Sequence, residues 1–265
     1  MKKVFSDEDL VKNLSLYYLN RHLKKKPIEK YHRQIDQSAL HDRDKYRKKS
    51  EILLLNCFLH HFPDVQFENL ICESPDFIAK INDKKIGIEL TEVINHLEVK
   101  KIESQLNKIF HNAQILLENE DTPKFRGVYF LEFHNLSAID LLEKQEEVVQ
   151  NIRQCIQKNK PFGYIKKIRK APHRRNVFIT HDYNLGLFDG LCSEKIIELI
   201  EKKNQKFPYY DRSVDECWLI IVSDMNSLAS RFTFIQNKEN LQQIQSPFHR
   251  IMHVENLCGS MTQIK

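Results

Sequence analysis

The chain is poor in glycine and lacks the glycine-rich motifs that bind nucleotides. Only 6 of its 265 residues are glycine, and neither GxGxxG nor GxxxxGK[S/T] occurs. Both motifs use glycine to bring backbone close to phosphate groups, so their absence argues against an enzyme with a nucleotide cofactor. GxSxG is absent too, which argues against a hydrolase with that serine elbow.

Long apolar runs and metal-type cysteine pairs are also missing. No stretch approaches the roughly 20 apolar residues that a membrane helix needs, and the start, MKKVFSDEDL, has no apolar signal core. The 6 cysteines show no CxxC spacing, and the 12 histidines show no zinc-ligand spacing. We therefore expect a cytoplasmic protein with reduced thiols and no membrane partner.

Positive charge is abundant and is gathered in two runs. Residues 21–49 hold eleven Lys/Arg against four Asp/Glu, and residues 158–176 hold eight Lys/Arg and no acid. Because the net charge of the whole chain is only +5, the remaining residues are acidic on balance. Such segregation favours a polyanion partner such as DNA, and two solvated lysine-rich faces are the alternative.

The hydrophobic pattern predicts an α/β fold with a mixed central β-sheet flanked by helices. The expected segments are an N-terminal basic helical arm (1–44), a core (45–134), a helical and hairpin insertion (135–215) and a C-terminal completion of the core (216–265). Helices are expected over residues 6–24, 45–61, 98–119, 140–158 and 193–206. Strands are expected over residues 65–72, 74–81, 85–93, 127–133, 163–170, 176–180, 217–222 and 250–254.

Two acidic residues fall on strand-like runs that a hairpin would bring together. The runs meet at Asn82-Asp83, residue types suited to a tight turn. With these two residues as the loop, Asp76 faces Glu89, with Cβ atoms about 4.5–5.5 Å apart. Like charges at that separation require a compensating cation, and paired carboxylates suit Mg²⁺ or Mn²⁺. A solvent-facing pair of acids at a sheet end is the alternative.

A third acid is expected to point inward from the helix over residues 45–61. Glu51 precedes Leu55 and Phe58 by four and seven residues, so it shares their inward stripe. Inward carboxylates are uncommon unless they are paired or bind a metal. Lys48 lies on the same stripe and is a candidate ion-pair partner.

These features resemble the PD-(D/E)XK superfamily of restriction-endonuclease-like nucleases. The likeness covers residues 45–134 and rests on Glu51, Pro75-Asp76 and Glu89-x-Thr91. The expected order of helix, three strands, helix and strand is also that of the family's common core. It implies a restriction-endonuclease-like core that hydrolyses phosphodiester bonds in DNA.

The resemblance also implies roles for single residues. Asp76, Glu89 and the main-chain carbonyl of Leu90 would bind Mg²⁺ or Mn²⁺, and Glu51 would complete the site. The departure is Thr91, which stands where the family has a lysine and cannot carry its charge. Lys48 is the best local candidate to replace that lysine.

The second basic run supplies candidate DNA contacts. We expect it to form a hairpin inserted into the fold, with Phe162 or Tyr164 available to stack on a base; a flexible solvated loop is the alternative. The lysines that end the helix over residues 193–206, at 202, 203 and 206, are already explained by its dipole. The candidate phosphate-binding residues are Lys166, Lys167, Arg169, Lys170, Arg174 and Arg175.

The sequence thus predicts a metal-dependent DNA endonuclease, of a kind that acts in restriction or phage defence. One alternative is a catalytically inactive DNA-binding protein of the same fold, for which Thr91 is the reason. Another is a protein-interaction domain whose acids are surface groups. A homodimer, the recognition sequence and the choice between endonuclease and exonuclease remain open.

Overall fold

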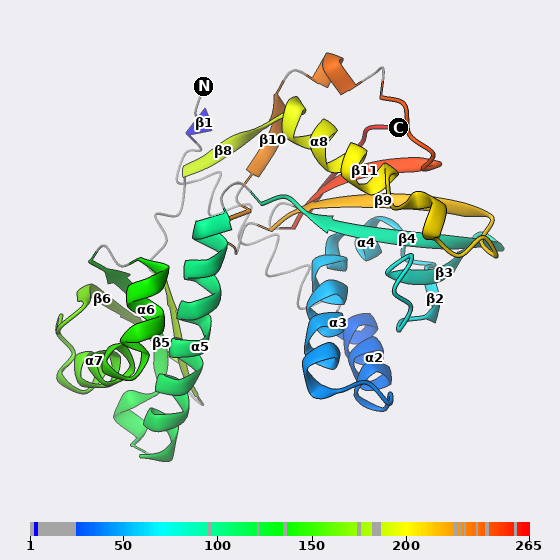
Figure 1. The fold of residues 1–265 in the computed structure, drawn as a ribbon. Helices are drawn as coiled ribbons and strands as arrows, with labels where there is room; N and C mark the ends of the chain where they lie inside the picture. Colours follow the sequence, from blue (N-terminus) through cyan, green and yellow to red (C-terminus); the bar gives the residue numbers. More distant parts are fainter. Residues whose placement is uncertain are drawn as a thin grey trace. The chain divides into compact units, whose positions relative to one another are not determined.

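The structure, a computed structural model, forms two compact units (Figure 1). The first comprises residues 1–94 and 186–265, and the second comprises residues 95–185. The predicted helix over residues 6–24 lies outside the described residues. The structure describes residues 3–4, 25–94, 97–120, 122–134, 137–173, 176–181, 187–224, 227, 229–230, 232–236, 238–241, 244–256 and 259–265.

A six-stranded mixed sheet organises the first unit, in the order β12-β11-β9-β4-β3-β2 (Figure 1). Strands β2, β3 and β4 form an antiparallel meander, β9 and β11 continue parallel to β4, and β12 is antiparallel to β11. The apolar run in β9 is buried, as expected for a strand covered on both faces. The bounds are β2 (Gln66–Asn69), β3 (Phe77–Ile81), β4 (Lys84–Glu92), β9 (Glu216–Ser223), β11 (Arg250–Glu255) and β12 (Ser260–Gln263).

The β3–β4 hairpin has the predicted register. Asn82 and Asp83 form its loop with φ of 48° and 64°, the left-handed conformation that a tight two-residue hairpin turn requires. Ile81 pairs with Lys84 and Phe77 pairs with Ile88. The prediction that Asn82-Asp83 sets the pairing is therefore confirmed.

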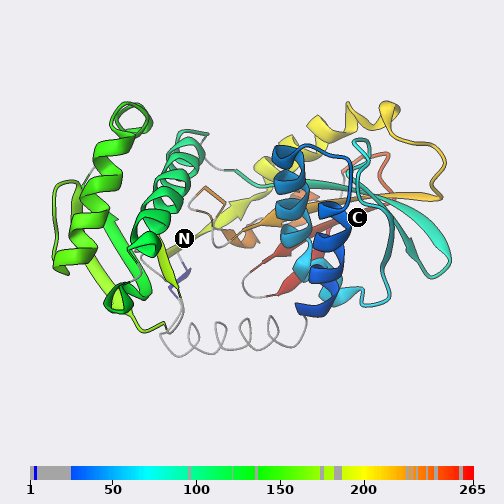
Figure 2. The ribbon, with the colours of Figure 1, turned by 90° about the horizontal axis from the view of Figure 1, so that it is seen from below.

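Helices cover both faces of this sheet, with α8 on one side and α2, α3 and α4 on the other (Figures 1 and 2). Ile52 and Leu55 pack with the inward residues of β4 on the α3 side, whereas Ile196 and Ile200 of α8 pack on the opposite side. The helices are α2 (Lys25–Asp36), α3 (Asp42–Leu54), α4 (Asn56–His61) and α8 (Ser193–Asn204). The short helices are η2 (Phe207–Tyr209) and η3 (Lys238–Leu241), and a small sheet joins β1 (Lys3–Val4), β8 (Leu187–Cys192) and β10 (Phe232–Gln236).

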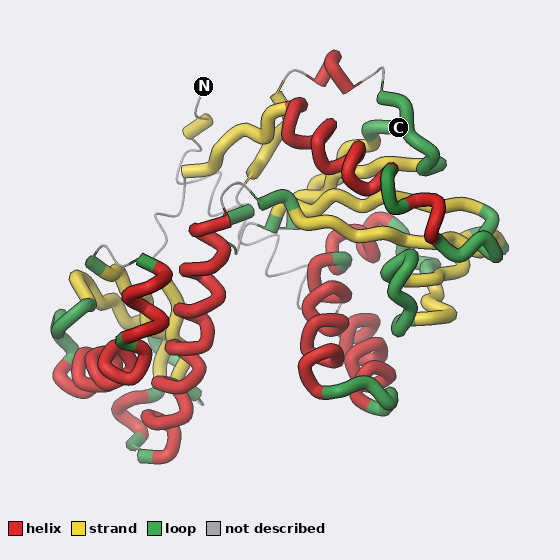
Figure 3. The backbone as a smooth tube through the Cα atoms, viewed as in Figure 1, coloured by secondary structure: helices red, strands yellow, loops and turns green. Residues whose placement is uncertain are grey.

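The second unit packs three helices on a three-stranded sheet of order β6-β5-β7. Residues of the sheet, α5 and α7 form its core, and Figure 3 distinguishes the helices and strands of this unit by colour. Strand β6 is antiparallel to β5, and β7 is parallel to it. The bounds are α5 (Leu97–Asn119), η1 (Pro123–Phe125), β5 (Gly127–Phe133), α6 (Ala138–Glu143), α7 (Gln145–Lys158), β6 (Ile165–Ala171) and β7 (Val177–His181).

The α/β class with a mixed sheet flanked by helices is confirmed, but three finer expectations differ from the structure. The helix expected over residues 45–61 is divided between α3 and α4 at Leu55, and the helix expected over residues 140–158 is divided between α6 and α7 at Lys144. Strand β5 belongs to the second unit's sheet and not to the central one, so the inserted unit is 95–185 and not 135–215. The expected basic hairpin does not form, because β6 and β7 both pair with β5, on opposite sides. A local apolar pattern marks a strand but does not say which strand it will pair with.

Among the described residues, no helix combines the length and apolar character needed to cross a membrane.

Candidate functional site

Asp76 and Glu89 lie together where the β3–β4 hairpin joins the centre of the sheet. The Asp76 carboxylate accepts a hydrogen bond at Oδ2 from the main-chain N–H of Leu90, at 2.7 Å. Because Phe77 pairs with Ile88, Asp76 occupies the next opposed position, facing Glu89. Burial and then the charge of Asp76 raise the pKa of the Glu89 carboxyl, as expected for two neighbouring acids.

A lysine to which the sequence assigned no role at this centre, Lys203 of α8, binds Glu89 of this acidic pair. Its Nζ donates to Oε1 of Glu89 at 2.5 Å and to the main-chain oxygen of Leu90 at 3.1 Å. Only 18% of the Lys203 side chain and 7% of the Glu89 side chain are exposed, so the ion pair is largely removed from water. The ammonium thus contacts two oxygens that the family resemblance assigns to a metal ion.

The second carboxylate oxygen of Glu89 has no such partner. Oε2 is buried and makes no hydrogen bond to the described part of the chain. A hydrogen-bonding contribution from the Tyr210 hydroxyl lowers the pKa of Glu89, although neither this hydroxyl nor Glu89 Oε2 has a partner in regular hydrogen-bond geometry among the described residues. Burial, followed by the charge of Glu89, raises the pKa of Tyr210, so this hydroxyl stays protonated. A buried, unpaired carboxylate oxygen is an available ligand for a cation.

Lys48 is fully committed to contacts within the fold. Its Nζ donates to the main-chain oxygens of Cys72 at 2.9 Å and Asp76 at 3.0 Å, and lies 4.8 Å from the centre of the Phe77 ring. The residue is 1% exposed. These contacts hold the backbone at Asp76 in place, which is a positioning role.

Glu51 approaches the same region from α3. Its Oε2 lies 3.0 Å from Lys48 Nζ, an ion-pair distance, but the two groups lack the alignment of a hydrogen bond. Burial is the largest cause that raises the pKa of Glu51; Lys48 offsets part of the rise, and the charge of Asp76 adds to it. Asp76 is therefore within electrostatic reach of both glutamates.

The three acids do not converge into a ready-made cage. Among the residues that the structure describes, no three His, Cys, Asp or Glu side chains are grouped closely enough to hold a metal ion. Glu89 faces α8, whereas Glu51 belongs to α3 on the other side of the sheet (Figure 1). What the structure brings together is a two-acid centre, Asp76 and Glu89, with Glu51 at its margin.

Thr91 occupies the position expected from strand alternation. It is half-buried on β4, two residues after Glu89 and therefore on the same face of the sheet. In the ladder it pairs with Ile221 of β9. Its hydroxyl is neutral, so the positive charge on this face comes from Lys203.

The basic side chains of β6 that were predicted to bind DNA lie in different environments. Lys166 forms an ion pair with Glu132 at 2.6 Å, and Lys170 donates to the main-chain oxygen of Lys124 at 2.6 Å. Lys167 is exposed, and the Arg169 guanidinium lies 5.4 Å from the centre of the Phe130 ring. The remaining two predicted residues, Arg174 and Arg175, lie outside the described residues.

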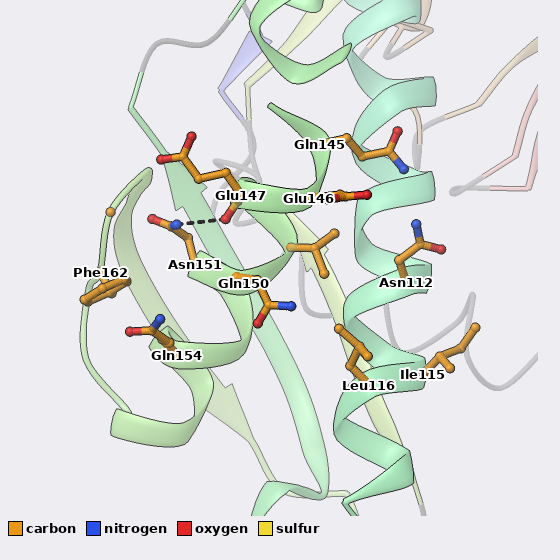
Figure 4. Close-up of a pocket in the computed structure, with 12 residues that line it drawn as sticks. Asn112, Ile115, Leu116, Gln145, Glu146, Glu147, Gln150, Asn151, Gln154 and Phe162 are labelled. Carbon is orange, nitrogen blue, oxygen red and sulfur yellow. Dashed lines mark hydrogen bonds between the residues drawn. The ribbon is translucent and has the colours of Figure 1, made fainter. Parts of the chain in front are cut away.

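The second unit also contains an open groove of about 900 Å³ between α5 and α7 (Figure 4). Carboxamides dominate its polar lining, and its charged groups are the acids Glu146 and Glu147. Asn151 on its wall donates to the main-chain oxygen of Glu147 at 2.8 Å. A groove with acidic and neutral walls does not attract phosphate, so it is not a candidate DNA site.

Comparison of the chain with protein-family models, curated proteins and solved structures found no match.

Proposed function

We propose that the protein is a metal-dependent nuclease that hydrolyses DNA phosphodiester bonds at the centre formed by Asp76 and Glu89. The observation that supports this most strongly is the surrounding set of oxygens. A buried Glu89 oxygen without a hydrogen bond, the Asp76 carboxylate and the Leu90 carbonyl are hard ligands on adjacent backbone. Such oxygens suit Mg²⁺ or Mn²⁺.

The order of elements in the first unit supports the same proposal. When the inserted second unit, the short helix α4 and strand β8 of the small sheet are passed over, α3, β2, β3, β4, α8 and β9 give helix, three strands, helix and strand. This is the core order on which the resemblance to PD-(D/E)XK nucleases rests. The closing helix and strand are then α8 and β9, in place of the segments over residues 98–119 and 127–133.

Each residue has a distinct part in the proposed reaction. Asp76, Glu89 and the Leu90 carbonyl would hold the metal, with Glu51 at its margin. When bound, the metal lowers the pKa of a coordinated water and polarises the scissile phosphate. Lys203, beside Glu89 on the face to which Thr91 brings no charge, supplies the cation that the family pattern places at position 91. Lys48 keeps the Asp76 backbone in position.

Plasmid nicking with Mn²⁺ or Mg²⁺ tests this proposal. Asp76→Asn should abolish metal-dependent nicking, because it removes the charge that the metal needs. The matched control is Asp83→Asn in the hairpin turn, where the side chain is 94% exposed and asparagine tolerates the positive φ. Equal activity of the parent and Asp76→Asn on every DNA substrate would contradict the proposal.

A nuclease fold that binds DNA without cleaving it is the second candidate. The observation in its favour is that the Lys203 ammonium already neutralises Glu89 in this structure. In such a protein the lysine takes the place of the metal, and added Mn²⁺ should leave the melting temperature unchanged. Metal-dependent stabilisation without cleavage would identify a metal-binding but inactive relative.

A further inference from the structure

One face of the second unit's sheet is not covered by its helices. The opposite face carries Tyr129 and Leu131, which are buried against α5 and α7. Successive residues of a strand point to opposite sides, so the neighbours of Tyr129 and Leu131 lie on the other face. This "open face" comprises Val128, Phe130 and Glu132 of β5, Lys167, Arg169 and Ala171 of β6, and Phe178 and Thr180 of β7.

Aromatic side chains lie at the centre of the open face. The ladder pairs Val128 with Phe178 and Phe130 with Thr180, so the two phenylalanines are diagonal neighbours on adjacent strands. Phe178 is 44% exposed, although a large apolar ring is normally buried. The His173 ring contacts it edge-on, at 4.9 Å between centroids. An exposed ring on a flat sheet is a surface on which a planar group can stack.

Positive charge borders these rings on the β6 side. Arg169 pairs with Phe130 across the strands, with its guanidinium 5.4 Å from the ring centre, and Lys167 pairs with Glu132. Glu132 is the one acid on the open face, and it is already bonded to Lys166. The run over residues 158–176, to which β6 belongs, contains eight Lys/Arg and no acid. The partner of this face is therefore anionic and has flat apolar groups.

We propose that the open face binds single-stranded nucleic acid, with bases stacked on Phe130 and Phe178 and phosphates held by Lys167 and Arg169. Base stacking on aromatic residues combined with basic side chains is the chemistry of single-strand recognition. A duplex keeps its bases stacked on one another and cannot offer them to a flat sheet. The open face lies outside the Asp76–Glu89 centre, so this proposal holds whether or not that centre cleaves DNA.

Fluorescence anisotropy with a labelled 12-nucleotide oligo(dT), measured in EDTA, tests the proposal without the metal centre. Phe178→Ala should weaken binding roughly 5- to 150-fold, the range for loss of one stacked base. Phe178→Tyr should restore it, because tyrosine keeps the ring. The matched control is Ile115→Ala on α5, an equally exposed apolar residue (43%) away from this face, which should bind as the parent does.

The basic residues are tested by salt titration of the same oligonucleotide. Arg169→Gln should reduce the slope of log K against log salt by about 0.7, the value for one phosphate contact on a single strand. Lys108→Gln, an exposed change on α5, should leave the slope unchanged. Equal affinity of Phe178→Ala and Ile115→Ala would overturn the proposal. Duplex DNA bound as tightly as the single strand would also overturn it. The same holds if the protein binds no oligonucleotide but self-associates, and Phe178→Ala abolishes that self-association.

Discussion

Replacing Lys203 with methionine should affect folding, metal binding and cleavage in different directions. In the metal-free protein Lys203 binds Glu89 at 2.5 Å, and the pair is mostly buried. Methionine keeps much of the side-chain volume but leaves the Glu89 carboxylate without its cation, next to Asp76. Removal of one partner from a buried ion pair costs about 3–5 kcal/mol, and the 18% exposure of Lys203 places this case near the lower end.

The loss is large enough to measure in the melting temperature. For a unit of this size, 1 kcal/mol corresponds to about 2–4 °C, so 3 kcal/mol corresponds to roughly 6–12 °C in EDTA. Mn²⁺ at 100 times its Kd should return about 2.7 kcal/mol. Because the ammonium no longer competes for Glu89 and Leu90, the variant should bind Mn²⁺ more tightly than the parent. Cleavage should fall by about 10²-fold, the scale of losing one positioned charge.

Fluorescence of Trp218, the single tryptophan, reports unfolding of the first unit, since its side chain is buried in that core. Melting would be followed with and without Mn²⁺, and plasmid nicking would be measured on the same samples. Lys202→Met is the matched control, because Lys202 is the exposed neighbour on α8. A variant that melts lower in EDTA but gains no more from Mn²⁺ than the parent would refute competition between Lys203 and the metal. Unchanged nicking would refute its role in the reaction.

Three further predictions concern the supports of the fold. Lys48→Met should destabilise the first unit by about 3–5 kcal/mol in urea unfolding followed by tryptophan fluorescence, with or without metal. It removes the cation paired with the largely buried Glu51 and leaves the Cys72 and Asp76 carbonyl groups without their donor. A change below about 1 kcal/mol would contradict the positioning role. Gly163→Ala should destabilise the second unit by about 2 kcal/mol or more, measured by amide hydrogen exchange. The φ of Gly163 is +56°, and a Cβ at this position would lie 1.2 Å from Asn151 Oδ1. Amide protection of α7 equal to that of the parent would refute this. Burial raises the pKa of Glu120, but hydrogen bonds, chiefly from Arg153, outweigh it and keep the pKa below its ordinary value. The stability that the ionised Glu120 contributes is fully present above its pKa in the unfolded chain, about 4.5, and is lost as the pH falls through its lower pKa in the folded protein. Arg153→Gln should therefore lower the hydrogen-exchange protection of the second unit by up to about 1 kcal/mol at pH 7 and by nothing at strongly acidic pH. A difference that does not change with pH would exclude this link between the Glu120 pKa and stability.

The sequence predicts best what is local. Asn82 and Asp83 favour a two-residue turn wherever they occur between two strands, so the register that places Asp76 against Glu89 follows without knowledge of the rest of the fold. Strand β5 shows the limit of this reasoning. Its bounds follow from its apolar run, but its partners, β6 and β7, lie more than 30 residues away and depend on the packing of a separate unit.

Lys203 was beyond the reach of sequence reasoning for the same reason. It lies 114 residues from Glu89 along the chain, and its position at the end of α8 is equally well explained by the helix dipole. For Lys48, the sequence spacing predicts its closeness to Glu51 but not its hydrogen bonds to the Cys72 and Asp76 carbonyl groups. The alternation that exposes Phe178 was readable, because Val177 and Ile179 flank it as inward residues of a strand.

The charges around the candidate centre bear on how it would meet DNA. Asp76 and Glu89 contribute two negative charges when ionised, against the one ammonium group of Lys203, whereas Glu51 is paired with Lys48 and Arg47. An excess of negative charge in a half-buried site repels a phosphate, and the low local dielectric strengthens that repulsion. A divalent cation reverses the sign, so the same centre then attracts the phosphate that it is proposed to cleave. Association through this centre should therefore require metal, whereas association through the open face of the second unit should not. The effect of EDTA on binding thus separates the two sites.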